Sequence, residues 1–203
     1  MFSLTAHPAA QSSVVHGIRT DVSRARDGVL VARYALEGDI DRLRVPLPVT
    51  PRMGDRLWQH TCFEIFIARK GLPPYHELNF SPSGAWAAYA FEAYRTPCHP
   101  PTGTSPGLRE NAGATAESAP LANASLDPQV SVRRGAGQLE LEALIRLDRL
   151  SPMYSRAALT LAVSAVIEDE EGVLSYWALA HPPGKPDFHH PHAFVFDLDE
   201  IRD

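Results

Sequence analysis

The chain has 203 residues, a formal net charge of −5 at pH 7 and 44% hydrophobic residues. This length and apolar content can supply one sizeable core, so we expect a single domain over residues 1–203. Acidic and basic residues are mixed along the chain without a basic stripe, which argues against a nucleic-acid partner. Residues 1–13 lack the pattern of a signal peptide, and no apolar run reaches the roughly 18 residues of a membrane helix. We therefore expect a soluble, cytoplasmic protein without a membrane partner.

Strand patterns begin at residues 29–36, which form a short apolar run before Gly38. A second extended run is predicted over residues 43–49. Pro46 and Pro48 interrupt it, and proline cannot donate to a strand ladder, so we expect this run at a sheet edge.

The strongest strand pattern covers residues 57–68. Strict alternation places one set of large apolar side chains on one face, which predicts the core face. The opposite face mixes aromatic, polar and ionisable groups, which a purely solvated face does not usually do. The predicted core set is Phe63, Ile65 and Ile67, and the opposite set is Trp58, His60, Cys62, Glu64 and Phe66.

Two further strands are predicted over residues 75–80 and 85–94, joined by the turn SPSG, which gives an antiparallel meander. Residues 96–128 have no periodicity and are rich in Pro and Ala, so we expect a flexible loop insertion. The two cysteines, Cys62 and Cys98, are too few for a disulfide framework and are expected to be free thiols.

The second half of the chain repeats the pattern of paired strands. Residues 129–134 and 138–147 predict a hairpin, a short helical turn follows, and residues 159–168 and 173–179 predict another hairpin. Residues 193–198 are expected to close the sheet. About nine or ten strands with little helix predict an all-β, two-sheet antiparallel sandwich of the immunoglobulin-like or jelly-roll-like kind. The side chains expected to point inward are Leu139, Leu141, Ala143 and Ile145, and Phe194, Phe196 and Leu198 are expected to share one face.

The meander carries the residue types of a sugar site. A sugar has apolar C–H faces and a rim of hydroxyls, so it is bound by flat aromatic surfaces with carboxylates, amides or guanidinium groups around them. At least one of Trp86 and Tyr89, which lie on opposite faces of their strand, is expected to be core instead. The candidate set is Trp58, Glu64, Glu77, Asn79, Trp86 and Tyr89.

Glu64 interrupts the apolar run FEIFI, where an unpaired buried carboxylate would be costly. It must therefore contact water, a protein partner or a ligand, and a structural salt bridge or hydrogen bond is as good an explanation as a ligand role. Six extended residues span about 20 Å. Trp58 and Glu64 can therefore meet one small ligand only if the chain bends near Trp58.

Three segments carry a family resemblance: LWQHTCFEIFI, YHELNFSPSGAWAAYAFEAYR and SAVIEDEEGVLSYWALAHPPGKPDFHHPHAF. The sequence resembles bacterial DOMON-like domains, which are related to family 9 carbohydrate-binding modules. The resemblance implies a β-sandwich in which a Trp followed six residues later by a Glu, here Trp58 and Glu64, contributes to a sugar site. The characterised modules hold the sugar between two tryptophans, whereas the corresponding loop here, PPGKPDFHHPH, offers Phe188 and histidines.

The function predicted from the sequence is non-catalytic binding of a small ligand, most simply a carbohydrate or another polyhydroxylated molecule, with no cofactor. Trp58 and Phe188 would stack on the ligand, and Glu64 and Asn79 would accept its hydroxyls. Arg95 or Lys185 could add a donor. A homo-oligomer is compatible with this function. No GxSxG, P-loop, HExxH or dinucleotide motif occurs, although Glu64 and Glu77 leave glycoside hydrolysis open.

Two alternatives stay open. The histidine-rich loop near the C-terminus could make the chain a metal-binding protein or a metal-dependent enzyme, with Asp187, His189 and His192 as zinc ligands. The acidic turn at residues 168–172 could bind calcium through carboxylate oxygens. The other alternative is a structural or interaction domain without a small-molecule site.

Overall fold

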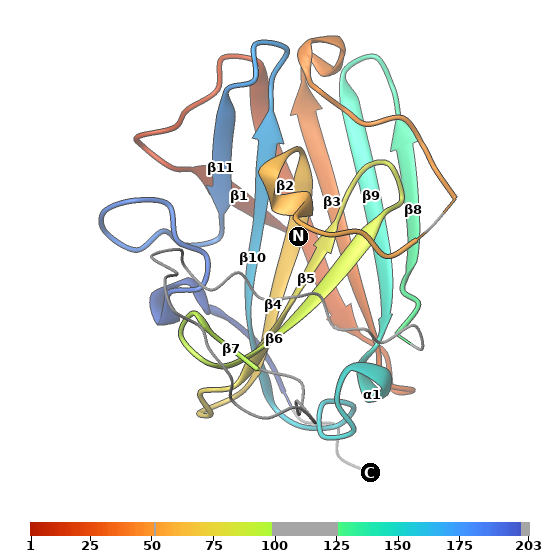
Figure 1. Ribbon diagram of the computed structural model, residues 1–203, viewed down its shortest axis with the longest axis vertical. Coiled ribbons are helices and arrows are strands. Elements are labelled where there is room, and N and C mark those ends of the chain that lie inside the picture. Colours follow the sequence, from red (N-terminus) through yellow and green to blue (C-terminus); the bar gives the residue numbers. More distant parts are fainter. Residues whose placement is uncertain (51, 99–125, 200–203) are drawn as a thin grey trace, which may run out of the picture.

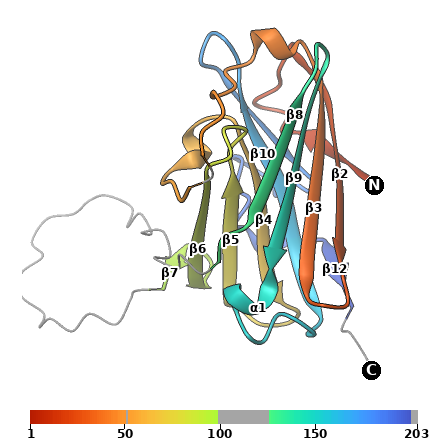
Figure 2. The same ribbon diagram turned by 90° about the vertical axis from the view of Figure 1, so that its right-hand side faces the viewer.

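The computed structural model describes residues 1–50, 52–98 and 126–199, and these residues form two layers of antiparallel strands (Figures 1 and 2). The predicted all-β sandwich is confirmed. Sheet A contains β2 (Val15–Arg24), β3 (Val29–Gly38), β9 (Gln138–Arg146) and β8 (Gln129–Arg134). Sheet B contains β7 (Thr96–Pro97), β6 (Trp86–Ala93), β5 (Tyr75–Phe80), β4 (Cys62–Arg69), β10 (Leu159–Glu168), β11 (Leu174–Ala178) and β12 (Phe196–Leu198).

The first strand, β1 (Phe2–Ala6), belongs to both sheets. Its first residues pair with β2, whereas Thr5 and Ala6 pair with β11. The strand therefore joins the two layers at one side of the sandwich. The short helices are η1 (Ile40–Arg42), η2 (Leu57–Gln59), α1 (Leu147–Leu150) and η3 (Pro191–Ala193).

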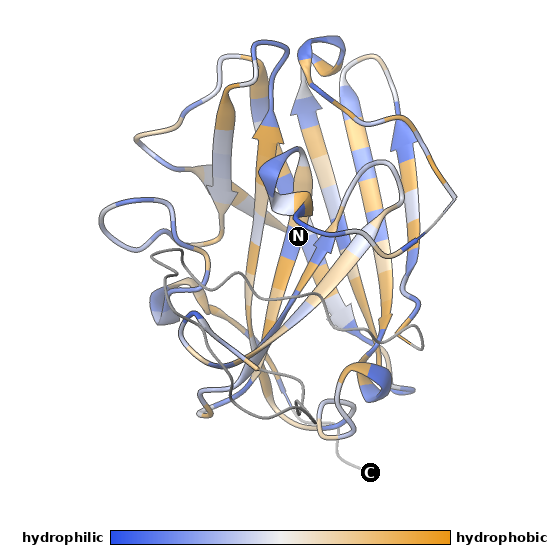
Figure 3. Ribbon diagram, viewed as in Figure 1, coloured by the Kyte–Doolittle hydropathy of each residue, from blue (hydrophilic) through white to orange (hydrophobic). Residues whose placement is uncertain are grey.

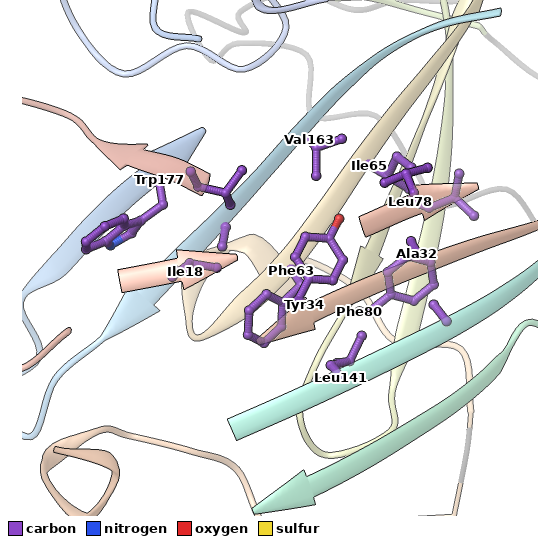
Figure 4. Close-up of a cluster of buried hydrophobic side chains, with 14 of the residues drawn as sticks. Ile18, Ala32, Tyr34, Phe63, Ile65, Leu78, Phe80, Leu141, Val163 and Trp177 are labelled. Atoms are coloured by element: carbon purple, nitrogen blue, oxygen red, sulfur yellow. The ribbon is translucent and has the colours of Figure 1, made fainter. Parts of the chain in front are cut away.

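The main core fills the space between the two sheets (Figure 4). Phe63, Ile65 and Ile67 of β4 all lie in it, as the alternation in the sequence predicted. The rings of Tyr34 from sheet A and Phe63 from sheet B have centroids 4.9 Å apart. The predicted inward residues of β9 are confirmed too, since Leu139, Leu141, Ala143 and Ile145 are each 0–1% exposed.

The two sheets differ in how much their outer faces are covered. Along β9 and β3, buried and more exposed residues alternate, so the outer face of sheet A meets water (Figure 3). In β4 every residue from Cys62 to Ala68 is buried, and β10 is almost as fully buried. A strand that is apolar on both faces is covered on both faces. Loops must therefore pack on the outer face of sheet B.

Tyr34 links the layers by a polar contact, because its hydroxyl donates to the main-chain oxygen of Glu64 at 2.7 Å. We expect Tyr34→Phe to lower the free energy of unfolding by about 1–3 kcal/mol, since the buried carbonyl loses its cross-sheet donor. Urea denaturation of both proteins measures the difference. Equal midpoints and slopes would contradict this role of the hydroxyl.

Two strand predictions in the first half of the chain need correction. Residues 43–49 form no strand and make only an isolated bridge between Leu43 and Asp169, so that prediction was wrong. Pro46 and Pro48 provide the reason, since neither can donate a hydrogen bond to a ladder. The strand predicted from residue 57 begins at Cys62 instead, and residues 57–59 are the 3₁₀ helix η2. Trp58 and His60 are therefore not part of the strand face that carries Glu64.

Phe194 does not lie on the face that the sequence predicted. It contacts Phe66 and Tyr75 on the outer face of sheet B, whereas Phe196 and Leu198 pack against the main core. The three do not share one face, because η3 ends beside Phe194 and the extended strand β12 begins only at Phe196.

The described residues form twelve strands, more than the nine or ten predicted. Strands β1, β2 and β7 were not anticipated, whereas residues 43–49 form no strand. Most of the predicted insertion 96–128 lies outside the described residues. Cys62 is buried and Cys98 exposed, both as free thiols. Among the residues described, no helix has the length and apolar character needed to cross a membrane.

Candidate functional site

A pocket of about 500 Å³ lies on the outer face of sheet B. Strands β4, β5, β6, β10 and β11 supply its floor. One wall comes from the segment around η2, and the other from the loop that joins β11 to β12, residues 179–195, called here the β11–β12 loop. The lining residues are Arg56, Trp58, Glu64, Phe66, Glu77, Tyr89, Phe91, Arg95, Pro97, Val166, Leu174, Tyr176, Pro186, Phe188 and His189.

Strand register sets the polar part of the floor. Glu64 of β4 pairs with Ser164 of β10 on one side and with Asn79 of β5 on the other. In the next row, Phe66 pairs with Glu77, so Glu64 and Glu77 are diagonal neighbours on one face. Diagonal residues on adjacent strands lie about 7–8 Å apart. The register therefore brings two carboxyl groups together at the floor of the pocket.

Both carboxyl groups are buried, with Glu64 2% and Glu77 5% exposed. The hydroxyl of Ser164 donates to Glu64 Oε2 at 3.2 Å. Burial, followed by the proximity of Glu77, raises the pKa of Glu64 well above its usual value of 4.5, although the Ser164 hydrogen bond opposes this. Burial raises the pKa of Glu77 to about 7, against the opposing effects of Asn79 and Arg95. The floor thus holds two carboxyl groups that ionise less readily than in water.

Asn79 lies directly beside the pair and is fully buried. Its Nδ2 donates to Glu77 Oε1 at 2.8 Å. Among the described residues, its Oδ1 has no hydrogen-bond partner. A buried acceptor without a donor is uncommon in proteins.

The η2 wall is held by Tyr89 of β6. The Tyr89 hydroxyl donates to Asp55 at 3.0 Å and accepts from the main-chain N–H of Arg56 at 3.0 Å. Arg56 has a φ of 51°, in the left-handed region, and this turns the chain into η2. Trp58 follows, 40% exposed, and lines the same pocket as Glu64. The chain therefore bends near Trp58, as it must if Trp58 and Glu64 are to contact the same small ligand.

The second wall is held by Asp187 in the β11–β12 loop. Asp187 accepts hydrogen bonds from the Tyr94 hydroxyl and from Arg95 NH2, the latter at 2.8 Å. Burial alone would raise the pKa of Asp187, but these hydrogen bonds and the charge of Arg95 lower it overall. The carboxylate therefore anchors the loop to the turn between β6 and β7.

His189 faces the carboxyl pair from this loop. Its Nε2 lies 3.5 Å from Glu77 Oε2, and its Nδ1 is 2.8 Å from the Tyr75 hydroxyl. Burial, followed by the charge of Arg95, lowers the pKa of His189 to about 4. The imidazole is therefore neutral near pH 7 and supplies no counter-charge to Glu77.

Backbone strain also gathers at this site. Arg56 and Arg95 both line the pocket, and both have left-handed φ values, of 51° and 49°. Such conformations cost about 1–3 kcal/mol and persist only where the surroundings impose them. The hydrogen bonds of Arg56 to Tyr89 and of Arg95 to Tyr75 and Asp187 fix the two turns.

Four of the six predicted ligand residues line the pocket: Trp58, Glu64, Arg95 and Phe188. The other two do not. Asn79 is fully buried beside the carboxyl pair and donates to Glu77, and Lys185 is in the β11–β12 loop without lining the pocket.

The predicted metal residues are not gathered into one site. Asp187 binds Tyr94 and Arg95, and His189 is directed at Glu77 and Tyr75. The main-chain N–H of His192 donates to the His190 ring at 3.1 Å. Within residues 1–50, 52–98 and 126–199, no group of three His, Cys, Asp or Glu side chains is placed to hold a metal ion. Glu168, from the predicted calcium turn, pairs instead with Arg44 and His60.

Several lining residues were not among the predicted ligand residues. Tyr176 lies in the pocket because its neighbour Trp177 is directed into the main core, and strand alternation could have indicated this. Arg56 carries no such signal, since its position depends on the turn before η2.

No family model matches the sequence, and no curated protein matches it. Among solved structures, the chain is similar to the crystal structure of a "putative carbohydrate-binding protein" from Bacteroides uniformis. The TM-score is 0.54 at 13% sequence identity, and the match covers 88% of this chain and 76% of the other. The two proteins share a fold.

Proposed function

We propose that this protein binds a carbohydrate or a similar polyhydroxylated ligand in the pocket on the outer face of sheet B, without catalysing a reaction. The observation that carries the proposal is the combination of surfaces in one pocket. Six of its lining residues are Trp, Tyr or Phe, and the floor carries two carboxyl groups. A volume of about 500 Å³ is within the range of small-ligand sites.

The aromatic residues come from different parts of the pocket, so a sugar ring can stack on more than one of them. Trp58 comes from η2, Phe188 from the β11–β12 loop, and Tyr176 from β11. Arg56 and Arg95 add guanidinium donors at the pocket. The resemblance to family 9 carbohydrate-binding modules and the name of the Bacteroides protein support the same ligand class.

Trp58 is the most exposed of the three tryptophans and the one that lines the pocket, so its removal is the direct test. We expect Trp58→Ala to weaken binding of a saccharide by at least about tenfold, because the ligand loses a large stacking surface. Isothermal titration calorimetry of both proteins with the same mono- and disaccharides measures the change.

The matched control is Phe2→Ala, which removes an exposed aromatic residue of β1 outside the pocket. This variant is expected to bind with unchanged affinity. An equal loss of saccharide affinity in both variants, or no loss in Trp58→Ala, would show that the ligand does not bind in this pocket.

A further inference from the structure

The floor of the pocket has more hydrogen-bond acceptors than donors. Glu64 and Glu77 offer four carboxyl oxygens. Next to them, but outside the pocket lining, the buried Oδ1 of Asn79 has no partner among the described residues. The protein groups directed at the two carboxyl groups are the Ser164 hydroxyl, Asn79 Nδ2 and His189 Nε2, the last at 3.5 Å from Glu77 Oε2. A ligand that fits this floor must therefore bring donors.

The floor also lacks a positive charge of its own. In the part of the chain that the structure describes, no Arg or Lys side chain forms an ion pair with Glu64 or Glu77. Arg95 forms its ion pair with Asp187 at 2.8 Å, and its charge lowers the pKa of Glu77 only in part; His189 is neutral near pH 7. Ionising both of these buried carboxyl groups without a counter-cation would cost free energy.

The aromatic residues of the lining favour a cation as well, and they act against the charges of Arg56 and Arg95 in the same pocket. Phe66 lies on β4 with Glu64, and Tyr89 and Phe91 lie on β6, next to the strand that carries Glu77. Tyr176 of β11 and Phe188 of the β11–β12 loop also line the pocket. Aromatic faces attract ammonium groups, and the attraction strengthens where water is excluded. An ammonium group also brings three donors and no acceptor, which is what the floor requires.

Given the carbohydrate-binding function proposed above, on which this inference rests, we infer that the ligand is an amino sugar with a free, protonated amine directed at Glu64 and Glu77. The sugar ring stacks on the aromatic walls. The ammonium group lies between the two carboxyl groups and supplies their positive counter-charge.

The test compares each hexosamine with its own neutral relatives. Calorimetric titrations use glucosamine and galactosamine, the parent hexoses glucose and galactose, and the two N-acetyl derivatives, in which the amine is no longer charged. At least one hexosamine is expected to bind about tenfold or more tightly than its hexose and its N-acetyl form, since hydrogen bonds to charged groups are worth about 1.5–3 kcal/mol.

Glu77→Gln keeps the shape of the side chain and removes its charge, so this advantage is expected to fall to less than about threefold. Glu168→Gln is the matched control, because Glu168 is an equally buried carboxyl, 5% exposed, that pairs with Arg44 and His60 away from the pocket. It is expected to keep the full advantage of the hexosamine.

A second measurement uses the wild-type chain and does not depend on any variant folding. The ammonium group lowers the pKa of the carboxyl pair, so binding of a hexosamine at pH 7 is expected to release protons, whereas binding of a hexose is not. Titrations in buffers of different ionisation enthalpy count these protons.

The outcomes separate the two proposals. Hexoses that bind as tightly as hexosamines, or an advantage that survives in Glu77→Gln, would overturn the amino-sugar inference and leave carbohydrate binding in place. Binding of none of the six sugars would overturn both.

Discussion

The free energy of unfolding of Glu77→Gln, measured relative to that of the wild type, is expected to increase by about 3 kcal/mol as the pH rises from 4.5 to 7. The cause is the burial of Glu77, which raises its pKa from 4.5 to about 7 in the folded state. Over this interval the folded wild type holds a proton that the unfolded chain has lost. The stability that this group contributes is therefore complete below pH 4.5 and is lost as the pH rises through about 7.

The difference between variant and wild type is the quantity to measure, because other groups titrate in the opposite direction. Burial lowers the pKa of both His76 and His189 to about 4, so their contribution to stability increases with pH in the same range. These histidines are present in both proteins and largely cancel in the difference. Arg95 and Asp187 also face this region, are likewise unchanged, and stay charged throughout. Glu64 does not cancel, because Glu77 is one cause of its raised pKa; removing the charge of Glu77 lowers the pKa of Glu64 and changes the difference in the same direction.

Urea denaturation at several pH values gives the difference curve. Tyr34→Phe is the control, since it changes the core without introducing or removing a group that titrates between pH 4.5 and 7; burial raises the pKa of Tyr34 well above 10. Its difference from the wild type is expected to be constant. A curve for Glu77→Gln that is equally flat would mean that the carboxyl group is solvated in the folded protein.

Phe63→Ala is expected to lower the free energy of unfolding by about 3–5 kcal/mol. Phe63 is fully buried between the sheets and contacts the ring of Tyr34, so its removal leaves a cavity that strands held by hydrogen bonds on both sides cannot close. Chemical denaturation measures this loss.

The control for Phe63→Ala is Leu72→Ala, at a residue that is 49% exposed in the turn after β4. Its effect is expected to stay within about 0.5 kcal/mol. Losses of similar size in the two variants would contradict the placement of the main core around Phe63.

Strand alternation accounts for most of what the sequence predicted. In β4 it separated Phe63, Ile65 and Ile67, which lie between the sheets, from Glu64 and Phe66, which line the pocket. The second face of β4 mixes aromatic, polar and ionisable side chains, and this mixture also carried information. A carboxyl group in an apolar strand indicates a covered face with a polar group in it, and the structure has a covered face with a pocket that Glu64 lines.

The walls of the pocket could not be predicted in the same way. Trp58 reaches the pocket because Arg56 adopts a left-handed conformation held by Tyr89, which is more than thirty residues away along the chain. The position of Phe188 depends on the attachment of Asp187 to Tyr94 and Arg95. Contacts of this kind join distant segments through single side chains, and no local pattern encodes them.

The proximity of Glu64 and Glu77 could be predicted from the sequence only in part. Both were recognised as candidate groups, but their proximity depends on the register between β4 and β5, where Glu64 pairs with Asn79. The turn after β4 sets that register, and shifting it by one residue would move Glu77 to the other face. Asn79 was predicted to bind ligand because it is a polar residue of the meander, and in the structure its amide donates to Glu77.

The most direct test of the proposed pocket is a saccharide titration followed by ¹H–¹⁵N NMR of the tryptophan indole groups. The chain has three tryptophans, of which Trp58 lines the pocket while Trp86 and Trp177 are buried in the main core. We predict a saturable shift of the Trp58 indole signal, with the signals of Trp86 and Trp177 almost unchanged. No saturable shift with any sugar, or a shift confined to Trp86 or Trp177, would contradict a sugar site on the outer face of sheet B.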